Sequence, residues 1–321
     1  MKRNSWQEYQ KEVADDRYYY LRSCIRQNFF PGSEKAFVRI LRQELGRDLF
    51  DDPVHTSCTG IGYHSDIVPL ETIMTVVARQ FALASEAGYE NLAVSCITSF
   101  GIYTEILETW QEFPELEAKV REHLFRATGR EFRKPKNVSH ASDIIFHHRE
   151  AIRQRAAYLL VNRRTGEPLR GVEHIGCHYA KIFPKEGIGG VEFPYVLAGM
   201  IEAWGGQVVD YPERRHCCGF GFRNYIVQAN RGYFGGQFAE EVRVHGTLQA
   251  RLYRGNCPGC AMFLDRWQYT IAEIEGTTYG EDDIIFVLAV QIHHRVDSCH
   301  DVWAVIVESL CCKYQIEGTG M

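Results

Sequence analysis

The residues of this chain that could do chemistry are its cysteines, 11 in a sequence of 321 residues. In the second half they occur as a single residue, an adjacent pair, and the two ends of a Cys-Pro-Gly-Cys run: Cys177, Cys217, Cys218, Cys257 and Cys260. A lone cysteine is often a buried packing residue, but thiolates are also soft ligands for iron and zinc. Clustering in this way favours metal binding or redox chemistry.

Composition excludes several other classes of function. The formal net charge of −5 gives no electrostatic case for a nucleic-acid partner. The first 20 residues are polar and rich in charged side chains, unlike a signal peptide, and no apolar run approaches the roughly 18 residues of a membrane helix. We therefore expect a cytoplasmic protein with no membrane span, in which reducing conditions disfavour structural disulfides.

The cysteines recur at matched spacing in the two halves of the chain. Three anchors align in order, each within similar local sequence: Cys24 with Cys177, Cys58 with Cys217, and Cys96 with Cys257. Successive anchors are 34 and 38 residues apart in the first half and 40 and 40 residues apart in the second. This agreement predicts a tandem duplication.

The segments around these anchors predict strands alternating with helices. Short apolar runs lead to four of the cysteines: "RYYYLRSC", "NLAVSC", "GVEHIGC" and "QARLYRGNC". The stretch from Pro69 to Gly88 has the ends of a helix. A second helix is expected behind Ser33 as N-cap, with apolar residues at helical spacing: Phe37, Ile40, Leu41 and Leu45.

This alternation predicts an α/β fold with a small parallel sheet and flanking helices in each half. The cysteines then fall at strand ends, where open α/β sheets gather their ligands. We expect a first domain over residues 1–130, a connector with a helix of its own over 131–165, and a second domain over 166–321.

The second-half pattern resembles a known family. One cysteine, then Cys-Cys-Gly, then Cys-x-x-Cys, at intervals near 40 residues, is similar to the cysteine-rich CCG domain that occurs twice in the B-type subunit of heterodisulfide reductase. The segments "YYYLRSCIRQNFFPG" and Cys58 to Gly101 are similar to the first domain of that protein, so the likeness spans nearly the whole chain. It implies two tandem, pseudo-symmetric CCG domains.

The resemblance also implies a cofactor. A noncubane [4Fe-4S] cluster would be held by the five thiolates of Cys177, Cys217, Cys218, Cys257 and Cys260, at a place where a disulfide is cleaved. Gly219 and Gly221 would remove side chains that collide with so large a group. A structural zinc ion held by four of the five cysteines is the alternative.

A function follows from the same resemblance. The chain would be an oxidoreductase subunit acting on a disulfide, persulfide or lipoyl-type sulfur compound, in a complex with A- and C-type subunits. His178 and Lys181 are candidate proton donors or anion anchors. No nicotinamide, flavin or ATP motif is visible, so electrons must arrive from a partner protein. The alternative is a relay or scaffold subunit that passes electrons without catalysing turnover.

The first half departs from the family pattern. By the alignment, Thr59 stands at the position of Cys218 and Ser99 at that of Cys260. The thiols that remain are Cys24, Cys58 and Cys96. They could hold a cubane with one iron left to His64 or to a substrate sulfur, or they could hold no cluster. An incomplete first motif of this kind is similar to that of some B-type subunits in the heterodisulfide-reductase-like complex of sulfur oxidisers.

The two replacements keep roughly the volume of cysteine while removing a soft donor. We therefore expect the first half to form a substrate-side pocket, in which a Gly60-Ile61-Gly62 turn with open backbone amides receives an anionic sulfur compound. Simple decay, with the surviving thiols as packing residues, is the alternative. At the end of the chain, Cys299, Cys311 and Cys312 are expected to pack in an amphipathic helix whose Trp303, Val307 and Leu310 could contact a partner.

Overall fold

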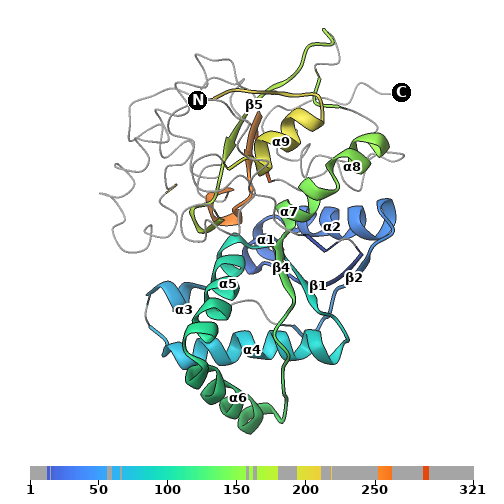
Figure 1. The fold of residues 1–321 in the computed structure, drawn as a ribbon. Helices are drawn as coiled ribbons and strands as arrows, with labels where there is room; N and C mark the ends of the chain where they lie inside the picture. The colour runs from blue at the N-terminus through green and yellow to red at the C-terminus, as the bar shows by residue number, and fades with distance from the viewer. Residues whose placement is uncertain are drawn as a thin grey trace.

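The computed structural model describes residues 13–14, 16–55, 60–65, 67–156, 159–161, 165–179, 194–210, 218, 252–261 and 285–288. Within these residues, the strands form two separate sheets of four parallel strands each, with helices packed around them (Figure 1). The predicted α/β class is confirmed. In the described part of the chain, no helix combines the length and apolar character that crossing a membrane requires.

The first sheet consists of β1 (Arg17–Leu21), β2 (Asp48–Phe50), β3 (Asn91–Val94) and β4 (Asn137–His140), in the order β2-β1-β3-β4. Strand β1 is buried from Tyr18 to Leu21. A strand covered on both faces carries a continuous apolar run, which is what "YYYL" provides. Strand β3 is likewise buried over its last three residues, "LAV".

Helices cover this sheet. They are α1 (Cys24–Phe29), α2 (Pro31–Arg39), the π-helical segment η2 (Ile40–Glu44), α3 (Gly60–Ser65), α4 (Leu70–Glu86), α5 (Ile97–Glu112) and α6 (Pro114–Thr128). Helix α4 agrees with its predicted ends, since Pro69 is the N-cap and Gly88 follows it with φ at 80°. A positive φ suits glycine, which has no Cβ to collide with the backbone.

One predicted cap is wrong. Helix α2 begins at Pro31, so Ser33 lies inside its first turn and is not the N-cap. Proline starts a helix well because its φ is already helical and its missing N–H needs no partner there. The Ser33 hydroxyl is buried and instead accepts a hydrogen bond from Nη1 of Arg26, at 3.1 Å.

The second sheet consists of β5 (Arg170–His174), β6 (Gln207–Val208), β7 (Leu252–Gly255) and β8 (Ile285–Leu288), in the order β6-β5-β7-β8. Its strands follow the same order as those of the first sheet. The registers also correspond: Leu21 of β1 pairs with Val94 of β3, and His174 of β5 pairs with Gly255 of β7. This correspondence is what a tandem duplication requires.

The segment between the sheets contains two helices, α7 (Ala141–His147) and α8 (Arg149–Arg155), where one was expected. Strand β4 lies within residues 131–165 and pairs with β3, so the first sheet extends into the range assigned to the connector. Helix α9 (Val196–Ala203) packs against β5 and α7. The domain limits given above remain a proposal.

The two halves touch closely where their cysteines lie. A Cβ atom added to Gly176 would be 2.8 Å from Cβ of Cys257 and 3.2 Å from Cγ2 of Ile97. Gly176 and Cys257 belong to the second half, while Ile97 begins α5 of the first. A second contact brings the ring of Tyr179 to 5.8 Å from that of Phe100 in α5. The junction therefore leaves no room for even a methyl group at Gly176.

We expect Gly176→Ala to lower the free energy of unfolding by about 1–3 kcal/mol, because the added methyl group overpacks the junction. Urea denaturation of the full chain measures this loss. Gly62→Ala is the matched control, since the nearest atom to its added Cβ, Cγ2 of Val68, would lie at 3.3 Å, against 2.8 Å for the nearest atom at Gly176. Equal losses in the two variants would contradict a tight junction.

Candidate metal centre

The described cysteines lie at the carboxyl ends of the central strands. Cys24 comes three residues after the end of β1 and Cys177 three residues after the end of β5. Cys96 and Cys257 each come two residues after the ends of β3 and β7. In each sheet these strands are neighbours from which the chain proceeds in opposite directions, which is the place where open α/β sheets bind ligands.

The cysteines after β3 and β7 have the same surroundings. The sulfur of Cys96 accepts hydrogen bonds from the backbone N–H groups of Thr98 and Ser99 at the start of α5. The sulfur of Cys257 accepts one from the backbone N–H of Cys260, at 3.4 Å, and another from that of Gly259. Helix N-termini stabilise negative sulfur in this way.

The second half brings further sulfur to this point. The Cys218 thiol donates to Sγ of Cys260 at 3.1 Å, and both residues are buried. His174, the last residue of β5, lies close enough that its ring nitrogen and the two sulfurs are all within 4.8 Å of one another. These three residues form a buried set of soft and borderline donors of the kind that holds iron or zinc.

The remaining predicted residues of the second half are only partly described. Cys177 is half-buried, and its sulfur lies 3.7 Å from Nδ1 of His178. Cys217, Gly219, Gly221 and Lys181 lie outside the described residues, as do the tail residues Cys299, Cys311 and Cys312 together with Trp303, Val307 and Leu310. The complete five-cysteine ligand set therefore stays a prediction.

In the first half, Cys24 is half-buried and Cys96 is buried, whereas Cys58 and Thr59 lie outside the described residues. His64 lies in α3, but its side chain is outside the described part. The expected turn at Gly60-Ile61-Gly62 is wrong, because these residues form the first turn of helix α3. Backbone N–H groups in the first turn of a helix have no intrahelical partner, so the predicted open amides stay a prediction.

The sulfurs of the second half compete for protons. A hydrogen bond from the Cys260 thiol lowers the pKa of Cys257, while the neighbouring sulfurs of Cys218 and Cys257 raise the pKa of Cys260 well above its usual range. Buried thiolates this close repel one another, so they ionise together only when a metal ion takes up their charge. The donor set therefore fits a metal or an iron–sulfur group, without distinguishing between them.

A buried cation completes the surroundings of the sulfurs. Arg26 of α1 is fully buried, and two of its nitrogens, Nε and Nη2, have no hydrogen-bond partner in the described structure. Burial lowers the pKa of Arg26 to about 10, while the thiols of Cys96 and Cys257 oppose that shift. The guanidinium thus stays charged at neutral pH, and its free N–H groups fit an anionic group.

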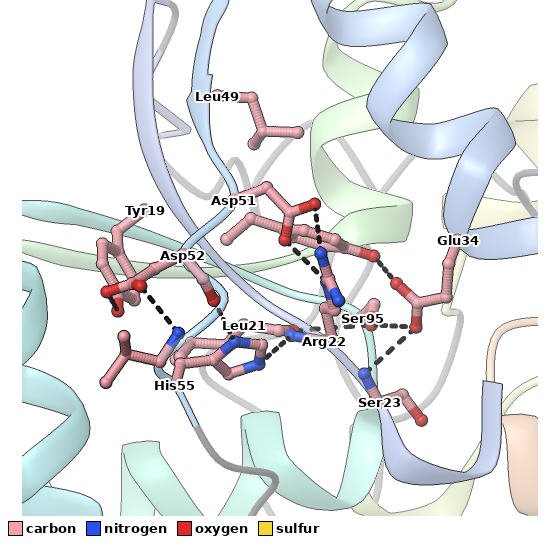
Figure 2. A network of polar contacts seen from close by, with 12 residues as sticks. Tyr19, Leu21, Arg22, Ser23, Glu34, Leu49, Asp51, Asp52, His55 and Ser95 are labelled. Atoms are coloured by element: carbon pink, nitrogen blue, oxygen red, sulfur yellow. Dashed lines mark hydrogen bonds and ion pairs between the residues drawn. The ribbon is translucent and has the colours of Figure 1, made fainter. Parts of the chain in front are cut away.

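A polar network holds the strand ends of the first half in place. Figure 2 shows Glu34 of α2 facing the residues that precede the two cysteines: its Oε1 accepts hydrogen bonds from the backbone N–H of Ser23 at 3.0 Å and from Oγ of Ser95 at 2.8 Å. The Tyr20 hydroxyl donates to its other oxygen. In the second half, Oδ1 of Asn256 accepts from the N–H of Gly176 at 2.9 Å. The amide of Asn256 thus accepts the backbone hydrogen bond that the carboxylate of Glu34 accepts in the first half.

The outer part of this network fixes the loop after β2. Arg22 makes a two-point ion pair with Asp51, at 2.6 and 2.7 Å, and its backbone N–H donates to Nε2 of His55 at 2.9 Å (Figure 2). Glu34 also lines a cavity of about 690 Å³ beside α2, whose other lining residues include Arg22 and Asp51. Protons of the solvent can therefore reach the buried carboxyl group.

Sequence reasoning missed three of these residues. These residues are His174, Arg26 and Glu34. They do not belong to the repeated cysteine pattern, and their roles depend on partners distant in the chain. The alignment contained one signal: Arg26 stands two residues after Cys24, at the position that Tyr179 has after Cys177. Both are fully buried beside the first cysteine of their half, although the two side chains differ in charge.

Comparisons with known proteins find a cysteine-rich family and two similar subunits. Residues 172–265 match the family described as CCG, a cysteine-rich domain. The chain is 26% identical over 285 residues to the B subunit of the ferredoxin:CoB-CoM heterodisulfide reductase of Methanosarcina acetivorans, covering 84% of this chain and 85% of that protein. It is also 26% identical over 266 residues to the B subunit of the ferredoxin/F(420)H(2)-dependent CoB-CoM heterodisulfide reductase of the same organism, covering 81% and 83%.

A solved structure shares the fold. The crystal structure of a hypothetical protein from Helicobacter pylori has a TM-score of 0.59 and 12% sequence identity, covering 90% of this chain. This chain spans about half of that protein, 52% of its length. At this identity the likeness concerns the fold alone.

The network around Glu34 generates a prediction about pH. Burial raises the pKa of Glu34 from 4.5 to about 7, against the lowering effect of its hydrogen bonds. Its protonated form is thus favoured by folding, so this contribution to stability is present below pH 4.5 and is lost as the pH rises to about 7. Glu34→Gln keeps the shape of the side chain but has no titratable group. The variant should therefore lose less stability than the wild type as the pH rises. Urea midpoints from pH 5 to pH 8 test it, and parallel profiles of the two proteins would contradict it.

Proposed function

We propose that this chain, which is 26% identical over most of its length to B subunits of heterodisulfide reductases, is the iron–sulfur subunit of a heterodisulfide-reductase-like complex. It would cleave or form disulfide or persulfide-type sulfur bonds in sulfur metabolism. The observation that carries this proposal is the buried contact of Cys218 with Cys260 at 3.1 Å, beside Cys257 at the end of β7. Soft donors at such a strand end favour an iron–sulfur group.

The ligands proposed for a noncubane [4Fe-4S] cluster are Cys177, Cys217, Cys218, Cys257 and Cys260. Bound there, the cluster would supply electron transfer and an iron site for sulfur. His174 is a further donor at the same place, and a zinc ion bound by His174, Cys218 and Cys260 is the second candidate that this geometry favours. Metal analysis separates the two.

Residues of the chain would serve the sulfur chemistry around that group. Reducing a disulfide consumes two electrons and two protons, so a proton donor must lie near the sulfur. His178 is the best placed of the described candidates, because its Nδ1 lies 3.7 Å from Sγ of Cys177. Lys181 is proposed as an anchor for an anionic substrate. The backbone N–H groups after Cys257 would hold negative charge on that sulfur.

The proposed setting is a cytoplasmic complex with A- and C-type subunits, one of which delivers the electrons. The substrate class is a disulfide, persulfide or lipoyl-type compound. A relay or scaffold subunit in the same complex is the alternative role. Turnover of a disulfide or persulfide by the isolated chain with an artificial reductant would favour catalysis, whereas electron uptake without turnover would favour the relay.

We expect about four iron and four sulfide ions per chain, all in the second half, because the first half lacks two of the five thiols. Cys218→Ser should remove the cluster signal in electron paramagnetic resonance (EPR) spectra and most of the iron. Cys96→Ser, the control at the corresponding strand end, should keep both. Measurements are made on anaerobically purified protein. Equal loss in the two variants, or stoichiometric zinc in the wild type, would overturn the assignment.

A further inference from the structure

We propose that Arg26, a residue of the first half, is the buried counter-charge of the sulfur centre in the second half and raises its reduction potential. The inference rests on the proposed function, because it requires a redox-active group on Cys257 and its neighbours. The first half, which has lost part of its own cysteine motif, would then contribute to the function of the second half.

The position of Arg26 is set by local structure. Ser23 caps helix α1, and its hydroxyl accepts a hydrogen bond from the Arg26 backbone N–H at 3.2 Å. The side chain is then directed into the protein, where Nη1 donates to Oγ of Ser33 at 3.1 Å. The contact with Ser33 leaves Nε and Nη2 buried, with no acceptor in the described structure.

A buried guanidinium with unused donors is costly unless an anion lies nearby. The buried carboxylate of α2 does not serve, because both oxygens of Glu34 are taken by Tyr20, Ser23 and Ser95. Burial lowers the pKa of Arg26, and negative charge on the sulfurs of Cys96 and Cys257 would counteract that shift. Both residues are buried, and backbone N–H groups donate to both sulfurs. Burial raises the pKa of Cys96 in spite of these hydrogen bonds, whereas the pKa of Cys257 is lowered, first by the hydrogen bond from Cys260.

Arg26 therefore acts across the junction between the halves. Cys257 lies at this junction, since a Cβ atom added to Gly176 would be 2.8 Å from Cβ of Cys257 and 3.2 Å from Cγ2 of Ile97 in α5. The corresponding residue of the second half, Tyr179, reaches in the opposite direction and packs against Phe100 of the first. Tyr179 thus packs its ring against the first half, while Arg26 lies buried beside the first cysteine of that half.

The electrostatic consequence has a definite sign. An iron–sulfur group bound by thiolates is anionic, and its reduced form carries one more negative charge than its oxidised form. A fixed positive charge in a region of low dielectric constant stabilises the reduced form more strongly. Removing the charge of Arg26 should therefore make the reduction potential of the second-half centre more negative. Because Arg26 acts on the centre only through its charge, its effect is measured as a change in the reduction potential of that centre.

The test is a redox titration of the purified complex, followed by EPR, with Arg26→Met and Arg26→Lys. Arg26→Met removes the charge at similar volume and should shift the midpoint potential to more negative values. Arg26→Lys keeps the charge and should restore most of the wild-type value. Arg121→Met is the matched control in α6, at the far end of the first half (Figure 1), where Arg121 pairs with Glu117. It should leave the potential unchanged.

Iron content and circular dichroism accompany each titration. A folded Arg26→Met variant without cluster, beside a loaded Arg26→Lys variant, would also support the proposal. A loaded Arg26→Met variant with the wild-type potential would overturn it, and would leave an anionic substrate as the partner of Arg26. Failure of both variants to fold would equally overturn it, because Arg26 would then serve the fold alone. Absence of iron from the wild type would instead refute the proposed function.

Discussion

The geometry of a parallel sheet brings the cysteines of each half together. In a parallel sheet all carboxyl ends lie at one edge, and the chain leaves the two central strands toward opposite sides, which opens a space between them. Cys24 and Cys96 lie at such a space in the first half, and Cys177 and Cys257 in the second. Helix N-termini then aim backbone N–H groups at Cys96 and Cys257. The strand order therefore sets the position of the site, whichever side chains then act as ligands.

This dependence explains how one half can lose cysteines and keep its shape. The backbone N–H of Ser99 reaches the sulfur of Cys96 just as that of Cys260 reaches Cys257. The turn is thus built by the helix start and does not require a thiol at its fourth position. Serine fits there, buried in the structure, while giving up a ligand that iron prefers.

Much of the frame could be predicted from the sequence because its signals are local. Apolar runs identify β1, β3, β5 and β7, and Pro69 with Gly88 identifies the ends of α4. The residues around the sulfurs could not be found this way. Glu34 meets Ser95 from 61 residues away, and His174 reaches Cys218 and Cys260 only once β5 lies beside β7. The error at Ser33 is of another kind, because the helix start at Pro31 lies only two residues before it in the sequence.

The continuity of each sheet along the chain has a consequence for synthesis on the ribosome. All four strands of the first sheet are complete by His140, before the first strand of the second sheet is made. Domains generally fold as units in the order of their synthesis, so the first half can fold while the second is still absent. Its face toward the junction, with Phe100 and Ile97, then stays exposed to water until Gly176 and Tyr179 arrive. During that interval the nascent chain presents an apolar surface that the finished protein covers.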